Sequence, residues 1–287
     1  MRLPKFEFLA PKTVQEACSL LSQHGDKAKV KAGGTDVLNV MKERKIAPQY
    51  LIGISGISDL DYIKADADGI KIGALTTLSS LGNSSVIKEK CPCLAEVPLK
   101  MATVQIRNMG TLGGNLCNAA PSADTAPILI CLGAKAKIAG PNGERVVALE
   151  DFFTGPGKTV LGNGELLVEI QVPAQPANTA GAYFKMSRVA VDLAVVGVGV
   201  VVTRDGDSCK DIKITLGAVA PTPIRAKKAE AVIKGKKVDD ALLEQAGKIA
   251  SEEATPIDDV RGSAFYRTEI VKVYTKRAIK QAMEQAK

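Results

Sequence analysis

The N-terminal part of the chain alternates helical patterns with short apolar runs. Thr13 and Glu16 form a Thr-x-x-Glu capping box, and apolar positions on one helical face follow it: Val14, Ala17, Cys18 and Leu21. Gly25 is the kind of residue that commonly ends such a helix. The further predicted elements are a strand at 27–32, a helix at 37–45 and a strand at 50–54. The pattern predicts a small α/β unit over residues 1–57.

The middle of the chain has a weaker pattern that is rich in Gly, Asn, Ala and Pro. Its clearest elements are a strand at 69–72, a helix at 126–132, a hairpin of 134–138 with 145–148, and a strand at 166–172. Pro173 ends the last strand. We therefore predict a second α/β unit over residues 58–176.

The C-terminal part separates strands from helices. Residues 173–180 have the composition of a linker. The elements predicted after it are strands at 182–188, 193–204 and 209–219, and helices at roughly 225–233, 239–254 and 263–285. Three strands followed by three helices indicate an α+β domain over residues 177–287, with helices on one face of the sheet.

Composition narrows the function classes. The chain has 287 residues, 46% of them hydrophobic, with 4% aromatic residues and no Trp. Wholesale disorder is excluded, and base stacking on single-stranded nucleic acid is disfavoured. The net charge of +7 is scattered and best fits a solvated surface. We expect a cytoplasmic protein without a membrane span, because no signal-peptide pattern or long apolar run occurs and the six cysteines are dispersed.

Acid–base and metal chemistry find little support in the residues. His24 is the single histidine, so a Ser-His-Asp hydrolase is improbable and a site built from several histidines is excluded. Cys91 and Cys93 are separated by one residue rather than the two to four usual in zinc sites, and no second pair follows nearby. We predict no metal site on this chain.

Two glycine-rich turns are the strongest candidates for ligand binding. They are Ala32-Gly33-Gly34-Thr35-Asp36 and Gly110-Thr111-Leu112-Gly113-Gly114-Asn115. Adjacent glycines permit positive φ and leave backbone amides open to a phosphate. Neither turn has Rossmann or P-loop spacing, and each alone is compatible with a plain turn. Because each N-terminal unit contributes one, the two together suggest a diphosphate held between the units.

The second turn belongs to a longer run, residues 107–125. Together with residues 32–36, this run closely resembles the FAD-binding medium subunits of the molybdenum hydroxylases, a family that includes xanthine dehydrogenase, carbon monoxide dehydrogenase and hydroxybenzoyl-CoA reductase. The resemblance covers essentially the whole chain and continues through residues 184–188, 217–225 and 259–267. It implies a mixed α/β (α+β) fold: a two-subdomain FAD-binding domain of the vanillyl-alcohol-oxidase/PCMH type, then an α+β domain with a three-stranded sheet.

The resemblance also implies roles for individual residues. Backbone amides of Ala32, Gly33, Gly34, Thr35 and Asp36, and of Thr111, Leu112, Gly113, Gly114 and Asn115, would hold the FAD diphosphate. Asp124 matches a ligand-binding Asp, Leu167 an apolar residue near the adenine, and Lys185 a lysine close to the flavin. Cys117 would face the isoalloxazine, and Asp192 would lie in a loop over it. Met101 stands where some relatives have an aromatic residue, and its thioether can pack in that place.

The resemblance implies an electron-transfer subunit. Electrons would come from a large molybdenum subunit through a small [2Fe–2S] subunit to FAD on this chain, and then pass to NAD, a quinone or ferredoxin. The molybdopterin and the [2Fe–2S] clusters would lie on those partners, in a heterotrimer or a dimer of heterotrimers. An extra iron–sulfur cluster is not expected, because only Cys131 follows the second turn within reach.

Two other functions remain open on sequence grounds. One is a stand-alone FAD-dependent oxidase or dehydrogenase of the same superfamily, which the single histidine and the short C-terminal domain disfavour. The other is a non-enzymatic protein that binds an anionic ligand through the glycine turns. The sequence names no substrate, because the molybdenum subunit would recognise it.

Overall fold

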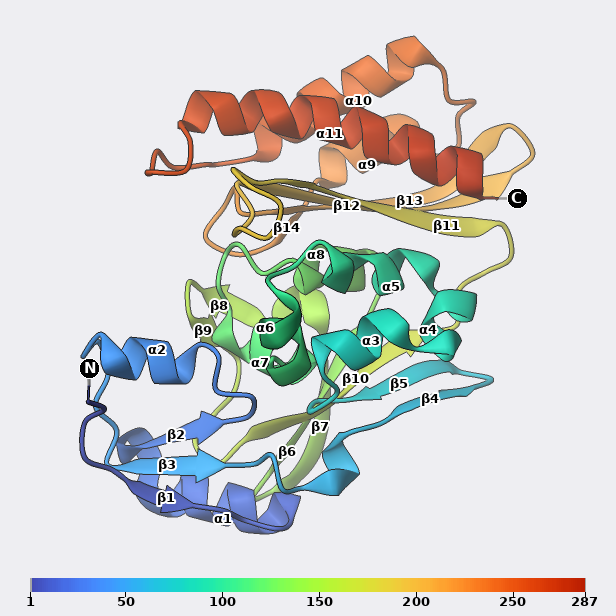
Figure 1. The fold of residues 1–287 in the computed structure, drawn as a ribbon. Coiled ribbons are helices and arrows are strands. Elements are labelled where there is room, and N and C mark those ends of the chain that lie inside the picture. Colours follow the sequence, from blue (N-terminus) through green and yellow to red (C-terminus); the bar gives the residue numbers. More distant parts are fainter. Residues whose placement is uncertain (1, 287) are drawn as a thin grey trace.

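Three sheets of three or more strands organise residues 2–286, the part of the chain that the computed structural model describes (Figure 1). Helices lie between the central and the C-terminal sheet, and further helices cover the outer face of the C-terminal sheet. None of the helices between residues 2 and 286 combines the length and the apolar character needed to span a membrane. Short 3₁₀ turns occur at Gly25–Lys27, Ser58–Leu60 and Leu149–Asp151.

The N-terminal unit contains a parallel sheet with the strand order β1-β3-β2. Its elements are β1 (Glu7–Leu9), α1 (Val14–His24), β2 (Ala28–Lys31), α2 (Val37–Lys42) and β3 (Tyr50–Gly53). The capping box forms, since the Thr13 hydroxyl accepts a hydrogen bond from the Glu16 amide. Helix α2 ends earlier than predicted, and Arg44 just beyond it has a left-handed φ of 60°.

The central sheet has five strands in the order β4-β5-β10-β6-β7. The strands are β4 (Ile63–Asp66), β5 (Gly69–Gly73), β6 (Lys135–Gly140), β7 (Gly143–Ala148) and β10 (Leu166–Pro173). The predicted hairpin is β6–β7. A small separate pair consists of β8 (Phe153–Gly155) and β9 (Lys158–Thr159).

Six short helices form the layer between the central and the C-terminal sheet (Figure 1). They are α3 (Leu78–Asn83), α4 (Ser85–Lys90), α5 (Pro92–Leu99), α6 (Val104–Met109), α7 (Leu112–Asn118) and α8 (Thr125–Cys131). Leu94, Leu116 and Leu129 from these helices share one core with Ile72 and Ile170 of the sheet. Leu166 and Val168 of β10 instead pack with the N-terminal unit. Domain boundaries near 57 and 176 stay a prediction, because the first two units share core residues.

The C-terminal part is an antiparallel sheet covered by three helices. Its elements are β11 (Thr179–Met186), β12 (Val196–Asp205), β13 (Ser208–Gly217), β14 (Ile224–Arg225), α9 (Lys227–Ile233), α10 (Asp240–Glu253) and α11 (Ala264–Gln285). The sheet has four strands rather than three, since the two-residue β14 pairs with β13 and is too short to show a strand pattern. The second predicted strand begins too early, because Leu193 is 57% exposed and lies in the loop before β12.

Strand β12 alternates Gly and Val, so its two faces differ. Val196, Val198 and Val200 are fully buried in the core shared with α9–α11. On the other face a Cβ at Gly199 would lie 3.0 Å from the backbone N of Ile128 in α8. Gly199 therefore lets the C-terminal sheet and α8 approach each other as closely as their backbones allow.

Candidate cofactor site

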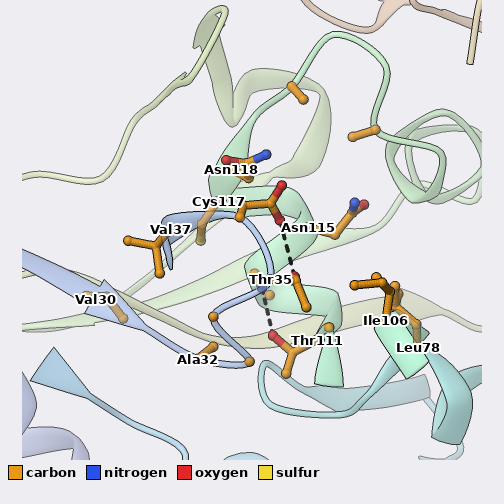
Figure 2. A pocket seen from close by; sticks show the side chains of 18 of the residues that line it. Val30, Ala32, Thr35, Val37, Leu78, Ile106, Thr111, Asn115, Cys117 and Asn118 are labelled. Carbon is orange, nitrogen blue, oxygen red and sulfur yellow. Dashed lines mark hydrogen bonds between the residues drawn. The ribbon is translucent and has the colours of Figure 1, made fainter. Parts of the chain in front are cut away.

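A cavity of about 750 Å³ lies where the N-terminal unit, the central helices and the C-terminal sheet meet. That volume is within the usual range for small-molecule and cofactor sites. Figure 2 shows the segment with Ala32 and Thr35 beside the segment with Thr111. The predicted site residues on its wall are Ala32, Gly33, Gly34, Thr35, Asp36, Met101, Thr111, Gly113, Gly114, Asn115, Cys117, Asp124, Leu167, Lys185 and Asp192.

The first glycine turn connects β2 to α2 and presses against another backbone segment. A Cβ at Gly33 would lie 1.7 Å from the Met109 carbonyl oxygen, so only glycine fits there. Gly34 has a φ of +83°. Between residues 2 and 286, the amides of Gly33, Gly34, Thr35 and Asp36 donate no hydrogen bond to the chain. A run of free amides facing a cavity is a favourable site for an anionic group.

The second turn uses most of its amides within the chain. Leu112 and Gly113 donate to the carbonyls of Thr76 and Ala74, both at 2.9 Å. Gly114 donates to the Thr111 hydroxyl at 3.0 Å, and Asn115 donates to the Thr111 carbonyl. For the four residues 112–115, the expectation that the backbone amides hold a diphosphate therefore needs revision.

The contribution of the second turn is instead one of shape. A Cβ at Gly113 would lie 2.7 Å from the Ala74 carbonyl oxygen, and a Cβ at Gly114 would lie 2.9 Å from the Thr111 hydroxyl. Because glycine has no side chain, the turn can pack directly against these neighbours where it forms the cavity wall. Leu112 points away from the cavity and is fully buried in the core of the helical layer.

A buried ion pair joins the helical layer to the C-terminal sheet. Lys185 Nζ on β11 lies 2.9 Å from Asp124 Oδ2, just before α8, and the two side chains are 4% and 7% exposed. Tyr183 donates its hydroxyl to Asp124 Oδ1 at 2.6 Å, and Lys185 also donates to the Lys100 carbonyl at 3.0 Å. Burial raises the pKa of Asp124, although Lys185 and Tyr183 act in the opposite direction.

Sequence reasoning identified Asp124 and Lys185 but missed Tyr183 and Lys100. Tyr183 stands two residues before Lys185 on the same face of β11, which is the available signal. Its hydroxyl fits because Gly197 lies nearby on β12, where a Cβ would come within 2.8 Å of it. Burial and the Asp124 carboxylate raise the pKa of Tyr183 well above its ordinary value.

The remaining predicted residues lie on different parts of the wall. Met101 and Leu167 are buried apolar residues, and Leu167 precedes an irregularity in the pairing of β10 with β6. Burial raises the pKa of the Cys117 thiol to about 12, so that thiol stays protonated at neutral pH. Asp192 lies in the loop of residues 187–194, where Arg188 at 2.8 Å holds the pKa of the carboxyl below its usual range.

The other chemistry-bearing residues lie away from this cavity. His24 stacks on Tyr50 with ring centroids 3.7 Å apart. Cys91 and Cys93 are buried with their sulfur atoms 3.9 Å apart, and all six cysteines are free. Between residues 2 and 286 there is no group of three or more His, Cys, Asp or Glu side chains that could hold a metal.

Comparison with known proteins shows the family to which the chain belongs. The profile described as the FAD binding domain in molybdopterin dehydrogenase matches residues 4–175, and that of the CO dehydrogenase flavoprotein C-terminal domain matches residues 181–282. The chain belongs to the FAD-binding subunits of the molybdopterin dehydrogenases. The predicted family and the predicted mixed fold of this flavoprotein subunit are thereby confirmed.

Curated relatives match along almost the whole subunit. The carbon monoxide dehydrogenase medium chain of Afipia carboxidovorans is 36% identical, covering 98% of each chain. The glyceraldehyde dehydrogenase medium chain of Sulfolobus acidocaldarius is 34% identical, covering 97% of this chain and 98% of the relative. The solved carbon monoxide dehydrogenase of Hydrogenophaga pseudoflava superposes with a TM-score of 0.98 at 38% identity, with both chains fully covered.

FAD is the cofactor of this flavoprotein subunit, and its relatives are subunits of molybdenum-hydroxylase oxidoreductases. The residues on the wall fit such a group. The free amides of the first turn suit a diphosphate, the close approaches at Gly33 and Gly114 exclude side chains, and Met101 and Leu167 offer apolar surface.

Proposed function

We propose that this flavoprotein subunit receives electrons from iron–sulfur centres on a small partner subunit and delivers them, through FAD in the cavity, to an acceptor such as NAD, a quinone or ferredoxin. The observation that carries the proposal is the convergence of three distant segments on one cavity. The turn at 32–36 supplies free amides, and the turn at 111–115 forms the adjacent wall. The Asp124–Lys185 pair brings a buried ammonium group to the same cavity.

Different residues of the cavity wall have different tasks in this proposal. The amides of Gly33 to Asp36 bind the diphosphate. Gly113 and Gly114 let the second turn pack closely against Ala74 and Thr111, which shapes the wall beside it. Met101 and Leu167 pack against the adenine, where a thioether and an aliphatic side chain replace aromatic stacking. These contacts orient the cofactor and keep water from its apolar parts.

The buried Lys185 and Asp124 side chains set the electrostatics of the cavity in this proposal. Bound FAD supplies the redox chemistry, and the protein contributes binding, orientation and electrostatics. Lys185 favours negative charge in its vicinity, because an ammonium group at a buried site is weakly screened. Asp124 holds Lys185 in place, Cys117 supplies a neutral wall, and Asp192 belongs to the loop at residues 187–194 that lines part of the cavity.

The partners follow from the kind of subunit that its relatives are. Several are medium chains or subunits by name, which supports a large molybdenum subunit and a small [2Fe–2S] subunit as partners of this chain. We propose a heterotrimer or a dimer of heterotrimers in the cytoplasm, with domains over 1–57, 58–176 and 177–287.

A glycine substitution tests the cofactor placement. Gly114→Val should lower FAD binding by about tenfold or more, because the new side chain meets the Thr111 hydroxyl and points toward Ala32. The measurement is bound FAD per purified chain and the Kd for FAD. Gly56→Val is the matched control, since a Cβ at Gly56 meets only the Lys12 side chain at 3.5 Å. Full FAD occupancy in Gly114→Val would refute the placement.

Isolation from its own cells tests the partners. A tagged chain should bring down two further polypeptides, together with molybdenum and iron by metal analysis. A yellow single polypeptide that oxidises a small alcohol unaided would instead support the stand-alone oxidase.

A further inference from the structure

We propose that Tyr183 is a positioning residue whose hydroxyl fixes Asp124, and through it Lys185, in the orientation that Lys185 presents to the cavity. The inference rests on the proposed function. Asp124 and Lys185 line the cavity, whereas Tyr183 lies behind them and is 1% exposed. Tyr183 therefore reaches the ligand only through its neighbours.

The geometry divides the two carboxylate oxygens between two donors. Tyr183 donates to Oδ1 at 2.6 Å, and Lys185 donates to Oδ2 at 2.9 Å. A carboxylate held at both oxygens cannot rotate without breaking a buried hydrogen bond, which is unfavourable because the freed group stays unsatisfied. The Lys185 ammonium, which approaches Oδ2, is thereby held in direction as well as in position.

The backbone around the cluster is built for this arrangement. Tyr183 and Lys185 pair with Gly199 and Gly197 across the β11–β12 ladder. A Cβ at Gly197 would lie 2.8 Å from the Tyr183 hydroxyl, so glycine leaves the space that the hydroxyl occupies. Lys100 fixes the strand from the other side, because its Nζ donates to the Tyr183 carbonyl at 2.7 Å and its carbonyl accepts from Lys185.

The arrangement predicts a distinctive pH dependence. The ionisable groups that face Asp124 are Lys185 and Tyr183, and Lys100 lies over the Tyr183 ring. Burial raises the pKa of Asp124, and the Tyr183 hydrogen bond lowers it. Loss of the hydroxyl should raise that pKa further, so Asp124 would take up a proton at a higher pH. Lys185 would then lose its counter-charge and its orientation.

Tyr183→Phe in the full chain tests this, because the ring is kept and only the hydroxyl is lost. We expect the Kd for FAD to rise about tenfold at neutral pH. We also expect FAD affinity, which should fall as the solution is acidified, to begin falling at a higher pH in the variant than in the unaltered chain. Tyr274→Phe is the control, since within residues 2–286 its hydroxyl makes a single hydrogen bond, a long one of 3.9 Å to the Met186 sulfur. The inference would be overturned if the Kd and its fall in acid were both unchanged. It would also be overturned if affinity were lost by the same factor at every pH.

Gly197→Ala provides a second variant, which keeps the Tyr183 hydroxyl but displaces it. The pH at which FAD affinity falls in acid should move upward in this variant too. If that pH is unchanged in Gly197→Ala, the result would also count against the positioning role. Thermal unfolding of the apo-chain shows whether either variant is folded. If the unaltered chain fails to bind FAD, the proposed function fails. If it binds FAD and Tyr183→Phe behaves identically, only the positioning role fails.

Discussion

Asp124→Leu should lower the free energy of unfolding by about 3–5 kcal/mol, because it leaves the Lys185 ammonium buried without its counter-charge, with the Lys100 carbonyl as its remaining hydrogen-bond acceptor. Both side chains are more than nine-tenths buried, so water cannot replace the lost carboxylate. Urea unfolding of the apo-chain at neutral pH measures the difference. Asp66→Leu is the control, since its pair with Lys71 is over 40% exposed at both ends and solvent screening makes such a pair a weak contributor to stability.

The double variant Asp124→Leu, Lys185→Met separates stability from function. Replacing both members of a buried ion pair by apolar residues is often neutral for stability, so most of the loss should be recovered. FAD affinity should stay low, because the cavity no longer has its buried cation. A single Asp124→Leu variant as stable as the unaltered chain would contradict the assignment of this pair.

Arg267→Leu should cost about 3–5 kcal/mol as well. Arg267 on α11 is 2% exposed, and its guanidinium donates to the carbonyls of Val195 and Ala218 at 3.2 and 3.0 Å. It also lies 2.6 Å from Asp259 Oδ1. The substitution takes this donor from two buried carbonyls and removes one of the two arginines that pair with Asp259, the other being Arg261. Arg188→Leu is the control, because Arg188 is 54% exposed.

The pH dependence of Arg267→Leu has a defined sign. Arg261 and Arg267 hold the pKa of Asp259 below its usual range. The contribution of Asp259 to stability is therefore present above the ordinary pKa of an aspartate and is lost as the pH falls through the lowered value. The difference in urea midpoint between the unaltered chain and Arg267→Leu should narrow in acid. A difference that is constant down to strongly acidic pH would argue against the ion pair.

Local patterns in the sequence were enough to find the glycine turns. The family resemblance assigned these turns to FAD and singled out Asp124 and Lys185 separately, but nothing in the sequence predicted that the two side chains form an ion pair. The direction in which a side chain points was harder to infer. Leu112 belongs to the second turn but faces the core, because the helix that begins there turns it inward. The amides of the second turn were assigned to the ligand, yet those of Leu112 and Gly113 bond to Thr76 and Ala74, more than thirty residues earlier in the chain. The amides of Gly114 and Asn115 bond to Thr111.

Long-range contacts account for the remaining differences. Tyr183 has a role only because β12 places Gly197 and α8 places Asp124 around it, and no local pattern contains those distances. Leu193 continues an apolar run but lies in an exposed loop, since a run of apolar residues does not distinguish a buried strand from the wall of a cavity. Strand β14 has two residues, which is below the length at which alternation is visible.

The bare glycine face of the C-terminal sheet limits how the molecule can move. A Cβ at Gly217 would lie 2.8 Å from the Pro127 ring, and one at Gly199 would lie 3.0 Å from the backbone of α8. At these two glycines no side chain separates the sheet from α8, although Tyr183 and Val201 of the sheet pack into the core of the helical layer. We therefore expect little sliding of the sheet on α8, so that Lys185 and Asp124 keep their spacing and adjustment to a ligand or an acceptor falls to the loop at residues 187–194.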